Sequence, residues 1–352
     1  MTFVISSNGF GHVKRVSSVL RILVKYSEKL NIVIVCNDCK KKLIQNDKVL
    51  NNLSFCTQIM KHEIDYLNQN EVDLSQYLKW KYDFENSDVV KNSDLIVSDN
   101  LVIPLFSNTK VILMGSFLWY DIIESKNNTL NKIANLEKKI LKIKRPKIIC
   151  LKSMYMSSIE KYTHPIKIPW FTHRNKAKLT TTIHKEVLIT GGGTGQLDEC
   201  LIKIAKSIAN CSTFKIYLDE RLINLYKINN QYNVHNFLTF DFRATSFNRL
   251  NVIICRPGIG ILTDCIKYSK PAIAVYDNNN KEIIHNAKQI EKQKLGIAIQ
   301  IKDGVVSNYA IHRIIKLINN RSNLNMYIKE IFQQEINGAK KASDIILKEV
   351  NL

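Results

Sequence analysis

Short apolar runs alternate with amphipathic stretches along most of the chain. In the first half the runs include Thr2–Ser6, Asn31–Cys36 and Asp94–Ser98, and in the second half Val187–Thr190 and Val252–Cys255. The segments between many of these runs have the apolar spacing of helices that bury one face. This alternation predicts parallel strands joined by crossover helices. We therefore predict an α/β protein with two doubly wound, Rossmann-like domains.

The pattern changes character over residues 164–185, which hold two prolines and a polar stretch with few apolar pairs. We predict a domain over residues 1–165, a linker over 166–185 and a second domain over 186–330. The remaining residues, 331–352, are expected to be helical, and packing back on the first domain is one arrangement open to them. Two such domains would face each other across a cleft at the carboxyl ends of their strands, where open parallel sheets bind ligands.

Composition excludes some classes of protein. The 352 residues are 45% hydrophobic and 23% charged, which is ordinary for a globular chain. The formal net charge is +20, from 51 basic and 31 acidic residues. This excess divides equally between the two halves of the chain, so it does not indicate a nucleic-acid interface. Compositional bias explains most of it, and an anionic substrate or a membrane surface remains the alternative.

Eight cysteines and the start of the chain bear on its compartment. Cys36 and Cys39 form a CxxC pair, but no second pair follows at the spacing of a zinc site, so packing at a strand end is the favoured interpretation. The first residues lack the basic leader and long apolar stretch of a signal peptide. No apolar run reaches the length of a membrane span. We expect a cytoplasmic protein, with contact at the inner face of the membrane as an open alternative.

The first chemical motif follows the first predicted strand. Gly9 and Gly11 frame a tight turn, and His12 and Arg15 follow at the start of a helix. The glycines permit close backbone approach, and a helix N-terminus favours an anion. His12 is therefore a candidate catalytic base, and Gly9, Gly11 and Arg15 are candidate substrate contacts. The alternative is that His12 only caps the helix.

The second motif is a glycine-rich loop between the first strand and helix of the second domain. Its N–H groups can cradle phosphate. It is not a P-loop, because the Gly-Lys-Ser/Thr ending is absent, and it lacks the dinucleotide spacing. A simple turn is the competing interpretation. The candidate residues are Gly191, Gly192, Gly193, Thr194 and Gly195.

The third motif is longer. A strand ends in Arg256 and Gly258, a helix carries Asp264, and a Lys-Pro pair precedes the next strand. A further helix then begins near Glu282 and carries His285 and Asn286. This order brings the glycine turn, the acid and the start of the last helix around one predicted pocket.

This third motif resembles the donor-binding half of GT-B glycosyltransferases. It is similar to the group that contains the peptidoglycan N-acetylglucosaminyltransferase that forms lipid II. The opening of the chain is similar to the same enzymes and also to the nucleotide-sugar hydrolase of pseudaminic acid synthesis. The resemblance covers both ends of the chain and leaves residues of about 40–90 and 120–180 unmatched. The motif residues that carry it are Gly9, Gly11, His12, Arg15, Arg256, Gly258, Asp264, Lys270, Pro271, Asn286 and Ala287.

The resemblance implies roles for several residues. Residues 192–195 would face the phosphates of the donor, Asp264 would hold the ribose hydroxyls, and Phe240 and Phe242 would flank the base. Enzymes of this group carry Gln three positions before the Asn-Ala pair, where this chain has Ile283. The departure puts a common hexose donor in doubt, so both a UDP-sugar and a CMP-activated nine-carbon acidic sugar stay open.

Asp99 completes the expected site. It follows a predicted strand of the first domain, where related enzymes place an Asp that orients the catalytic base; a strand-end turn is the alternative. The resemblance implies an inverting transfer to a glycan or lipid-linked acceptor in bacterial surface polysaccharide synthesis, with no metal, no cofactor and no nucleic-acid partner. The alternatives are a nucleotide-sugar hydrolase that uses water and a non-catalytic nucleotide-sugar-binding protein.

Overall fold

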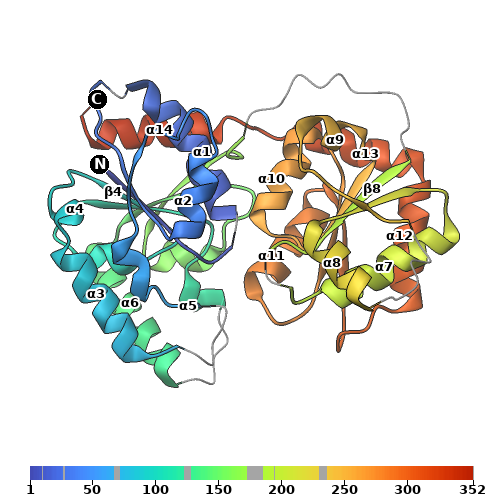
Figure 1. Ribbon diagram of the computed structural model, residues 1–352, viewed down its shortest axis with the longest axis horizontal. Helices are drawn as coiled ribbons and strands as arrows, with labels where there is room; N and C mark the ends of the chain where they lie inside the picture. Colours follow the sequence, from blue (N-terminus) through green and yellow to red (C-terminus); the bar gives the residue numbers. More distant parts are fainter. Residues whose placement is uncertain are drawn as a thin grey trace. The chain divides into compact units, whose positions relative to one another are not determined.

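The chain folds into two compact α/β units, seen in a computed structural model that describes residues 1–9, 11–26, 28–66, 72–122, 128–172, 185–193, 195–229 and 236–351 (Figure 1). Unit 1 consists of Met1–Thr172 together with Asn337–Leu352, and unit 2 consists of His173–Ile336. Each unit has its own parallel sheet and its own buried apolar cores. The predicted α/β class, with two doubly wound domains, is confirmed.

Unit 1 is built on a seven-stranded sheet with the order β3-β2-β1-β4-β5-β6-β7, in which every pairing is parallel. All residues of the central strands β1 and β4 are buried, as expected for a parallel sheet covered on both faces by helices. The strands are β1 (Thr2–Ile5), β2 (Val33–Val35), β3 (Ser54–Cys56), β4 (Ile96–Asp99), β5 (Val111–Met114), β6 (Lys147–Leu151) and β7 (His164–Ile168).

The helices of unit 1 bury one apolar face each. In α1 the buried Val13, Val16, Leu20 and Leu23 recur at helical spacing and lie against the sheet. The α-helices are α1 (Gly11–Leu23), α2 (Asp38–Gln45), α3 (Leu74–Asn86), α4 (Asp88–Lys91), α5 (Trp119–Ile122), α6 (Asn128–Lys144) and α14 (Gly338–Glu349). Short 3-10 turns are η1 (Val24–Tyr26), η2 (Gln58–His62), η4 (Ile103–Phe106) and η5 (Ser157–Lys161).

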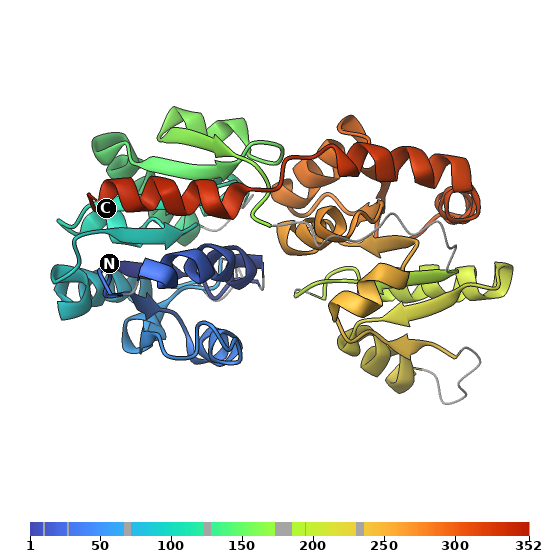
Figure 2. The same cartoon turned by 90° about the horizontal axis from the view of Figure 1, so that it is seen from above.

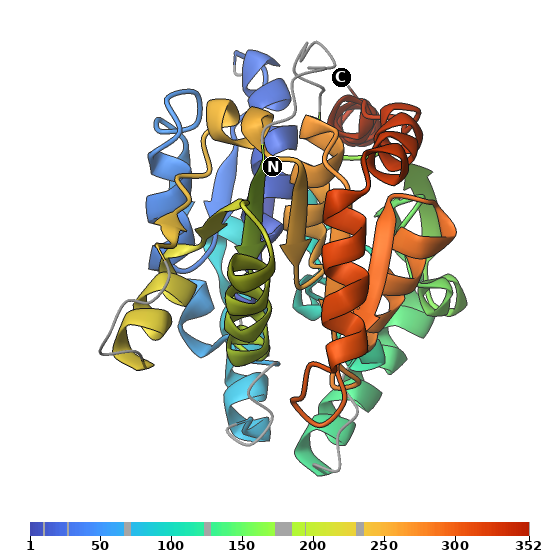
Figure 3. The same ribbon diagram turned by 90° about the vertical axis from the view of Figure 1, so that its right-hand side faces the viewer.

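Unit 2 has a six-stranded parallel sheet with the order β10-β9-β8-β11-β12-β13. Its strands are β8 (Glu186–Thr190), β9 (Lys215–Leu218), β10 (Leu238–Thr239), β11 (Val252–Cys255), β12 (Ala272–Tyr276) and β13 (Gly296–Gln300). Its helices are α7 (Asp198–Cys211), α8 (Glu220–Asn229), α9 (Ala244–Arg249), α10 (Ile259–Tyr268), α11 (Lys281–Lys292), α12 (Asn308–Asn319) and α13 (Arg321–Phe332). Helices α7 and α12 lie side by side and close a core against the strands (Figure 3).

The start of the predicted linker is part of the first sheet. The sequence prediction assigned residues from 166 onward to a linker, but β7 extends to Ile168. Residues 164–168 form β7, paired in parallel with β6 at the edge of the first sheet. A proline within this strand is compatible with pairing because an edge strand needs only one row of backbone hydrogen bonds. The described chain continues in unit 1 to Thr172, and predicted linker residues 173–184 lie outside the described residues.

The end of the chain returns to unit 1. Helix α13 ends at Phe332 in unit 2, and α14 packs along α1 and beside β7 (Figure 2). The α14 N-terminus is held by Gly338, whose backbone N–H donates to the Trp170 carbonyl at 2.9 Å. Ser343 adds a hydrogen bond from its hydroxyl to the Val19 carbonyl at 3.4 Å. The chain therefore returns to unit 1 at residue 337. The sequence analysis had placed the end of the second domain earlier, at residue 330.

Candidate active site

The first part of the candidate site lies where β1 and β4 end in unit 1. These strands are neighbours, with Ile5 opposite Asp99. The chain after β1 turns at Gly9, whose φ of +89° favours glycine, and enters α1 at Gly11. His12, on the first turn of α1, is thereby brought to Asp99: the distance from His12 Nδ1 to Asp99 Oδ2 is 2.7 Å. The two residues that the sequence analysis paired, His12 and Asp99, are therefore in direct contact.

Arg15 takes part in the same cluster and not in an open substrate site. Its Nε donates to Asp99 Oδ1 at 2.8 Å, and its Nη2 donates to the same oxygen and to Asn100 Oδ1 at 3.1 Å. Arg15 is 6% exposed and Asp99 is fully buried. A buried carboxylate needs such a partner, since an unpaired buried charge is costly. Arg15 was predicted as a substrate contact; in the structure its side chain contacts Asp99 and Asn100.

The geometry behind Asp99 is tightly restricted. Asn100 has a φ of +61°, and its side-chain oxygen accepts from Arg15. A Cβ at Gly115 would lie 1.6 Å from Asn100 Oδ1, so only glycine fits beside this amide. The fold thus fixes Asn100, which in turn helps to fix Arg15 and Asp99.

This cluster can perform general-base chemistry. With Asp99 accepting a hydrogen bond from Nδ1–H, the other ring nitrogen of His12, Nε2, keeps its lone pair for a proton. The His12 ring lies 6.1 Å, centroid to centroid, from the ring of Trp119. Trp119 is itself stacked on Tyr66 at 5.2 Å. Aromatic side chains therefore form one wall beside His12.

A half-buried carboxylate that the sequence did not reveal holds the loop before His12. Glu63 Oε1 accepts from the Ser6 hydroxyl at 3.0 Å, from the Ser7 N–H at 2.9 Å and from the Asn8 amide at 3.4 Å. Burial raises the pKa of Glu63 to about 7, against the lowering effect of these donors and of the Lys40 charge. Lys40 in turn donates to the Gly9 carbonyl at 2.6 Å.

The second part of the candidate site is the glycine loop of unit 2, after β8. Gly192 and Gly195 have φ values of +69° and +76°. A Cβ at Gly191 would lie 2.5 Å from Asp198 Oδ1. The loop is anchored by Asp219, whose Oδ2 accepts from the Gly191 N–H at 3.0 Å. The predicted Gly193 is exposed, and the predicted Thr194 lies outside the described residues.

Arg221 is a second residue that sequence reasoning missed. It stands on the first turn of α8, and its Nη2 donates to Asp198 Oδ1 at 2.7 Å. A Cβ built on Gly195 would lie 3.5 Å from Arg221 Nη1, so the guanidinium borders the glycine loop. A bordering cation and loop N–H groups together make an environment suited to phosphate. No local motif around Arg221 predicts its position beside the glycine loop. The pairing of β8 with β9 brings the start of α8 to the loop that follows β8.

Residues after β11 form a connected turn. Asn286 on α11 is fully buried, and its amide donates to the Pro257 carbonyl at 2.9 Å and to Glu282 Oε1 at 3.4 Å. Asn286, expected to contact the donor, is thus engaged in holding the turn that carries Arg256. Burial lowers the pKa of Arg256, and the charges of Glu282 and Asp277 oppose that lowering.

Gly258 caps α10 with a φ of −72°, which any residue can adopt. Its conformation therefore does not require glycine. A Cβ at this position would also meet no atom within 4 Å, so a larger side chain would fit. Ile283, at the position where similar enzymes carry Gln, is 1% exposed and belongs to the apolar interior. His285 is half-buried on the same helix.

An aromatic group stands at the β10 side of unit 2. Phe242 contacts Phe240 at 5.1 Å and Phe247 at 6.1 Å between ring centroids. Its φ is +54°, an unusual conformation for a bulky residue, and its side chain is 42% exposed. Asp264 is 8% exposed on α10, and its charge adds to burial in raising the pKa of Tyr268, which stacks on Phe247.

Other expectations concern metals, thiols and membranes. Within the described ranges, no group of three His, Cys, Asp or Glu side chains could hold a metal ion. Cys36 is buried, which raises the pKa of its thiol to about 12, and Cys39 is exposed. No helix among the described residues is long and apolar enough to span a bilayer.

Comparison with known proteins gives one family match and several similar structures. Residues 186–345 match the family model of the glycosyltransferase family 28 C-terminal domain. A search of curated proteins finds no significant match to the sequence.

Solved structures match the whole chain. A glycotransferase of kitacinnamycin aligns with a TM-score of 0.67 at 12% identity, over 99% of this chain and 98% of that one. MurG of Acinetobacter baumannii aligns with a TM-score of 0.63 at 13% identity, over 99% of both chains. Os79 of O. sativa, solved with U2F and trichothecene, aligns with a TM-score of 0.68 at 9% identity, over 99% of both. The chain therefore has the GT-B fold of glycosyltransferases. Its second unit is similar to the C-terminal domain of family 28.

Proposed function

We propose that the protein is an inverting, metal-independent glycosyltransferase that moves a sugar from a nucleotide-activated donor to a hydroxyl of a glycan or lipid-linked acceptor of bacterial surface polysaccharide. The observation that carries the proposal is the buried His12–Asp99 pair at the start of α1. The family 28 match of unit 2 and the GT-B fold support the class of reaction.

The proposed step is a single displacement. His12 Nε2 takes the proton of the acceptor hydroxyl as its oxygen forms a bond to the anomeric carbon. The bond from that carbon to the phosphate oxygen breaks, and the nucleotide leaves with the electron pair. Asp99 stabilises the imidazolium that forms. The loop N–H groups, Arg221 and Arg256 offset the charge of the leaving phosphate. One displacement inverts the anomeric centre.

The donor stays open between two classes. The buried Ile283 leaves no polar side chain at the position that similar enzymes use for the hexose hydroxyls. A UDP-sugar and a CMP-activated nonulosonic acid are both therefore included in the proposal. Asp264 is proposed for the ribose, and the exposed ring of Phe242 for the base.

A lipid-linked acceptor fits one surface of unit 1. The end of α6 exposes Lys142, Lys144 and the following Arg145, with Ile143 67% exposed between the lysines. Basic side chains around an exposed apolar one suit contact with an anionic membrane surface. The nearby Lys147 does not add to this surface charge, because it pairs with Glu349 of α14 at 2.6 Å.

The test measures nucleotide release from UDP- and CMP-sugars, with and without polyprenyl-diphosphate-linked sugars as acceptors. We expect release to require acceptor, and His12→Ala to lower turnover about 10²–10⁴-fold with unchanged donor affinity. His164→Ala, at an exposed histidine of the same unit, is the matched control. A destabilised His12→Ala protein with normal turnover would support the helix-cap alternative. Release at full rate into water alone would make the protein a hydrolase.

A further inference from the structure

Arg15 and His12 share one carboxylate. Arg15 Nε donates to Asp99 Oδ1 at 2.8 Å, and Arg15 Nη2 donates to the same oxygen. His12 Nδ1 lies 2.7 Å from the other oxygen, Oδ2. All three side chains are buried. The two partners of Asp99 therefore occupy different oxygens and do not displace one another.

The hydrogens of Arg15 Nη2 are both used by acceptors other than the imidazole. One is donated to Asp99 Oδ1, and the other to Asn100 Oδ1 at 3.1 Å. Nη2 also lies 3.3 Å from His12 Nδ1, but this amino group has only two hydrogens. None remains for the imidazole, so Nδ1 carries its own proton and donates a hydrogen bond to Asp99. The other ring nitrogen, Nε2, then keeps its lone pair.

Asn100 is fixed as the second acceptor for Arg15. Its φ is +61°, its backbone N–H donates to the Met114 carbonyl at 3.0 Å, and a Cβ on Gly115 would lie 1.6 Å from its Oδ1. The amide must present its oxygen to Arg15, because a guanidinium only donates hydrogen bonds. Arg15 is thereby held between two rigid acceptors.

Arg15 and Asp99 carry opposite charges in this buried cluster. With both present the pair is neutral, so Asp99 orients the imidazole without offering it an unpaired negative charge. Without the guanidinium, His12 would be the one cationic partner left to the carboxylate among these three side chains. A nearby opposite charge favours the protonated imidazole, which has no lone pair for the proton of a hydroxyl.

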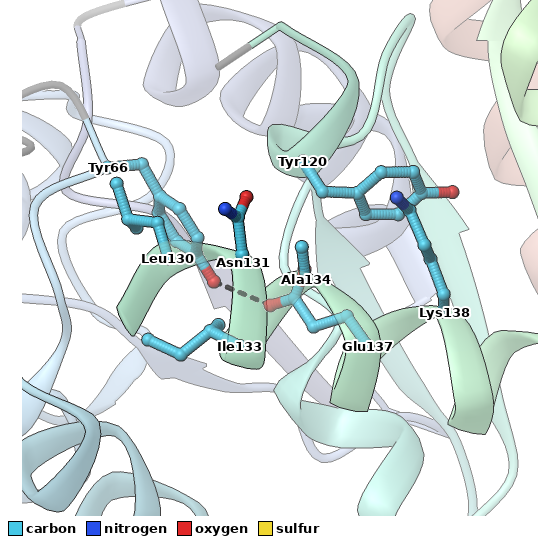
Figure 4. Close-up of a pocket in the computed structure, with 8 residues that line it drawn as sticks. All are labelled: Tyr66, Tyr120, Leu130, Asn131, Ile133, Ala134, Glu137 and Lys138. Carbon is cyan, nitrogen blue, oxygen red and sulfur yellow. Dashed lines mark hydrogen bonds between the residues drawn. The ribbon is translucent and has the colours of Figure 1, made fainter. Parts of the chain in front are cut away.

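Other ionisable groups near His12 lie along the loop that precedes it and along the aromatic wall. Glu63 and Lys40 hydrogen-bond the backbone of that loop. Tyr66, in the aromatic wall, donates its hydroxyl to Glu137 at 2.6 Å (Figure 4). Burial raises the pKa of both carboxyls to about 7. These groups are the same in every variant of the arginine, so their effects cancel in a comparison with wild type.

We propose that Arg15 is a positioning residue of the reaction: it neutralises and orients Asp99, so that His12 is held in one tautomer with Nε2 ready to take a proton. The inference rests on the proposed function, because it assigns how the same base is kept ready. It adds the guanidinium, held by Asn100, to the pair formed by His12 and Asp99.

Titration of His12 tests this role without any substrate. Long-range ¹H–¹⁵N NMR of the labelled full chain distinguishes the two tautomers and the imidazolium, and His12→Gln identifies the signal among the eight histidines. We expect the Nδ1–H tautomer in wild type. In Arg15→Gln, the pH at which His12 is half protonated should rise by about 1–3 units. Arg21→Gln, at a half-exposed arginine of α1 that pairs with Asp47, should leave that pH unchanged.

Turnover supplies a second measurement. In Arg15→Gln the acid limb of the pH profile of kcat should move upward by the same interval, so that activity lost at pH 7 returns at alkaline pH, with an unchanged KM for the donor. A residue that only supports the fold would lower kcat equally at every pH. That result, an unchanged titration of His12 in Arg15→Gln, or the Nε2–H tautomer in wild type would each overturn the proposal.

A double variant covers the case in which Arg15→Gln does not fold. Arg15→Gln combined with Asp99→Asn buries neither charge. Folding of the double variant alone would support neutralisation of Asp99 as the task of Arg15, whereas failure of both to fold would assign Arg15 to packing and overturn the proposal. If wild type turns over no nucleotide sugar while the titration of His12 still rises in Arg15→Gln, the proposed function fails and the charge relation among the three residues stands.

Discussion

At the scale of single residues, three charged groups of unit 1 gather close to one strand end. Asp99, Arg15 and Glu63 all lie beneath the turn that presents His12. Asp99 pairs with Arg15 and His12, and Glu63 Oε1 accepts from Ser6 and Ser7, so the turn is held from both sides. Buried polar networks of this kind fix geometry more than they add stability.

Glu63 should make the stability of unit 1 depend on pH. Its pKa is about 7 when folded, against a value near 4.5 when unfolded. Between these values the folded chain binds more protons, so stability falls as pH rises from 4.5 to 7 and the loss is then constant. Glu63→Gln lacks this loss. The free energy of unfolding of Glu63→Gln, relative to that of wild type, should therefore rise by about 3 kcal/mol between pH 4.5 and pH 7. This corresponds to about 1.4 kcal/mol for each pKa unit.

Urea unfolding followed by tryptophan fluorescence measures this, because all three tryptophans belong to unit 1. Glu137, whose pKa burial also raises to about 7, adds a term of the same sign in both proteins and cancels in the difference. A difference between Glu63→Gln and wild type that does not change with pH would contradict the assignment.

Arg221 should act on phosphate and not on the nucleoside. Arg221→Gln removes one charged donor beside the glycine loop, and hydrogen bonds to charged groups contribute about 1.5–3 kcal/mol. Calorimetry should therefore show a UDP or CMP affinity lowered at least tenfold and an unchanged affinity for uridine or cytidine. Arg243→Gln, at a largely exposed arginine of the same unit, is the control. Equal weakening of nucleotide and nucleoside would place Arg221 outside the phosphate site.

At the scale of elements, the site depends on where strands end. β1 and β4 place the His12 turn and Asp99 side by side, and β8 and β11 place the glycine loop beside the Arg256 turn. The parallel register of the strands therefore sets which loops lie next to each other in each unit. Helix α14 completes unit 1 from the far end of the chain by covering α1.

Gly338 should be essential for the docking of α14. A Cβ at this position would lie 2.1 Å from the Pro169 carbonyl oxygen and 2.7 Å from that of Trp170. Gly338→Ala must displace the helix start, at a cost of about 1–3 kcal/mol. Thermal unfolding followed by tryptophan fluorescence should show a lower Tm, while the exposed Lys340→Ala nearby should change little. An unchanged Tm in Gly338→Ala would show that α14 adjusts freely.

At the scale of the whole molecule, the chain combines a GT-B fold with a formal charge of +20. The donors and membrane lipids in the proposal are anionic, so the field of the molecule favours their approach. The excess is spread along the chain, and the specific contacts must come from particular residues such as Arg221 and Arg256.

Chelation should leave the reaction intact. The described residues offer no cluster of three metal-ligating side chains, and the proposed phosphate contacts are N–H groups and guanidiniums. EDTA should therefore leave turnover unchanged. Loss of turnover with EDTA and recovery with Mg²⁺ or Mn²⁺ would show that a metal bridges the phosphates.

The sequence by itself determined the fold class, most strand positions and the residues His12 and Asp99, because these depend on local periodicity and on turns at strand ends. Only the tertiary structure decided the partners. Glu63 and Arg221 reach their loops across the sheets, Arg15 and Asn286 are drawn into buried contacts, and residues 164–168 pair as an edge strand. Local pattern carries no information on such contacts, since packing between distant segments selects which side chain each buried group meets.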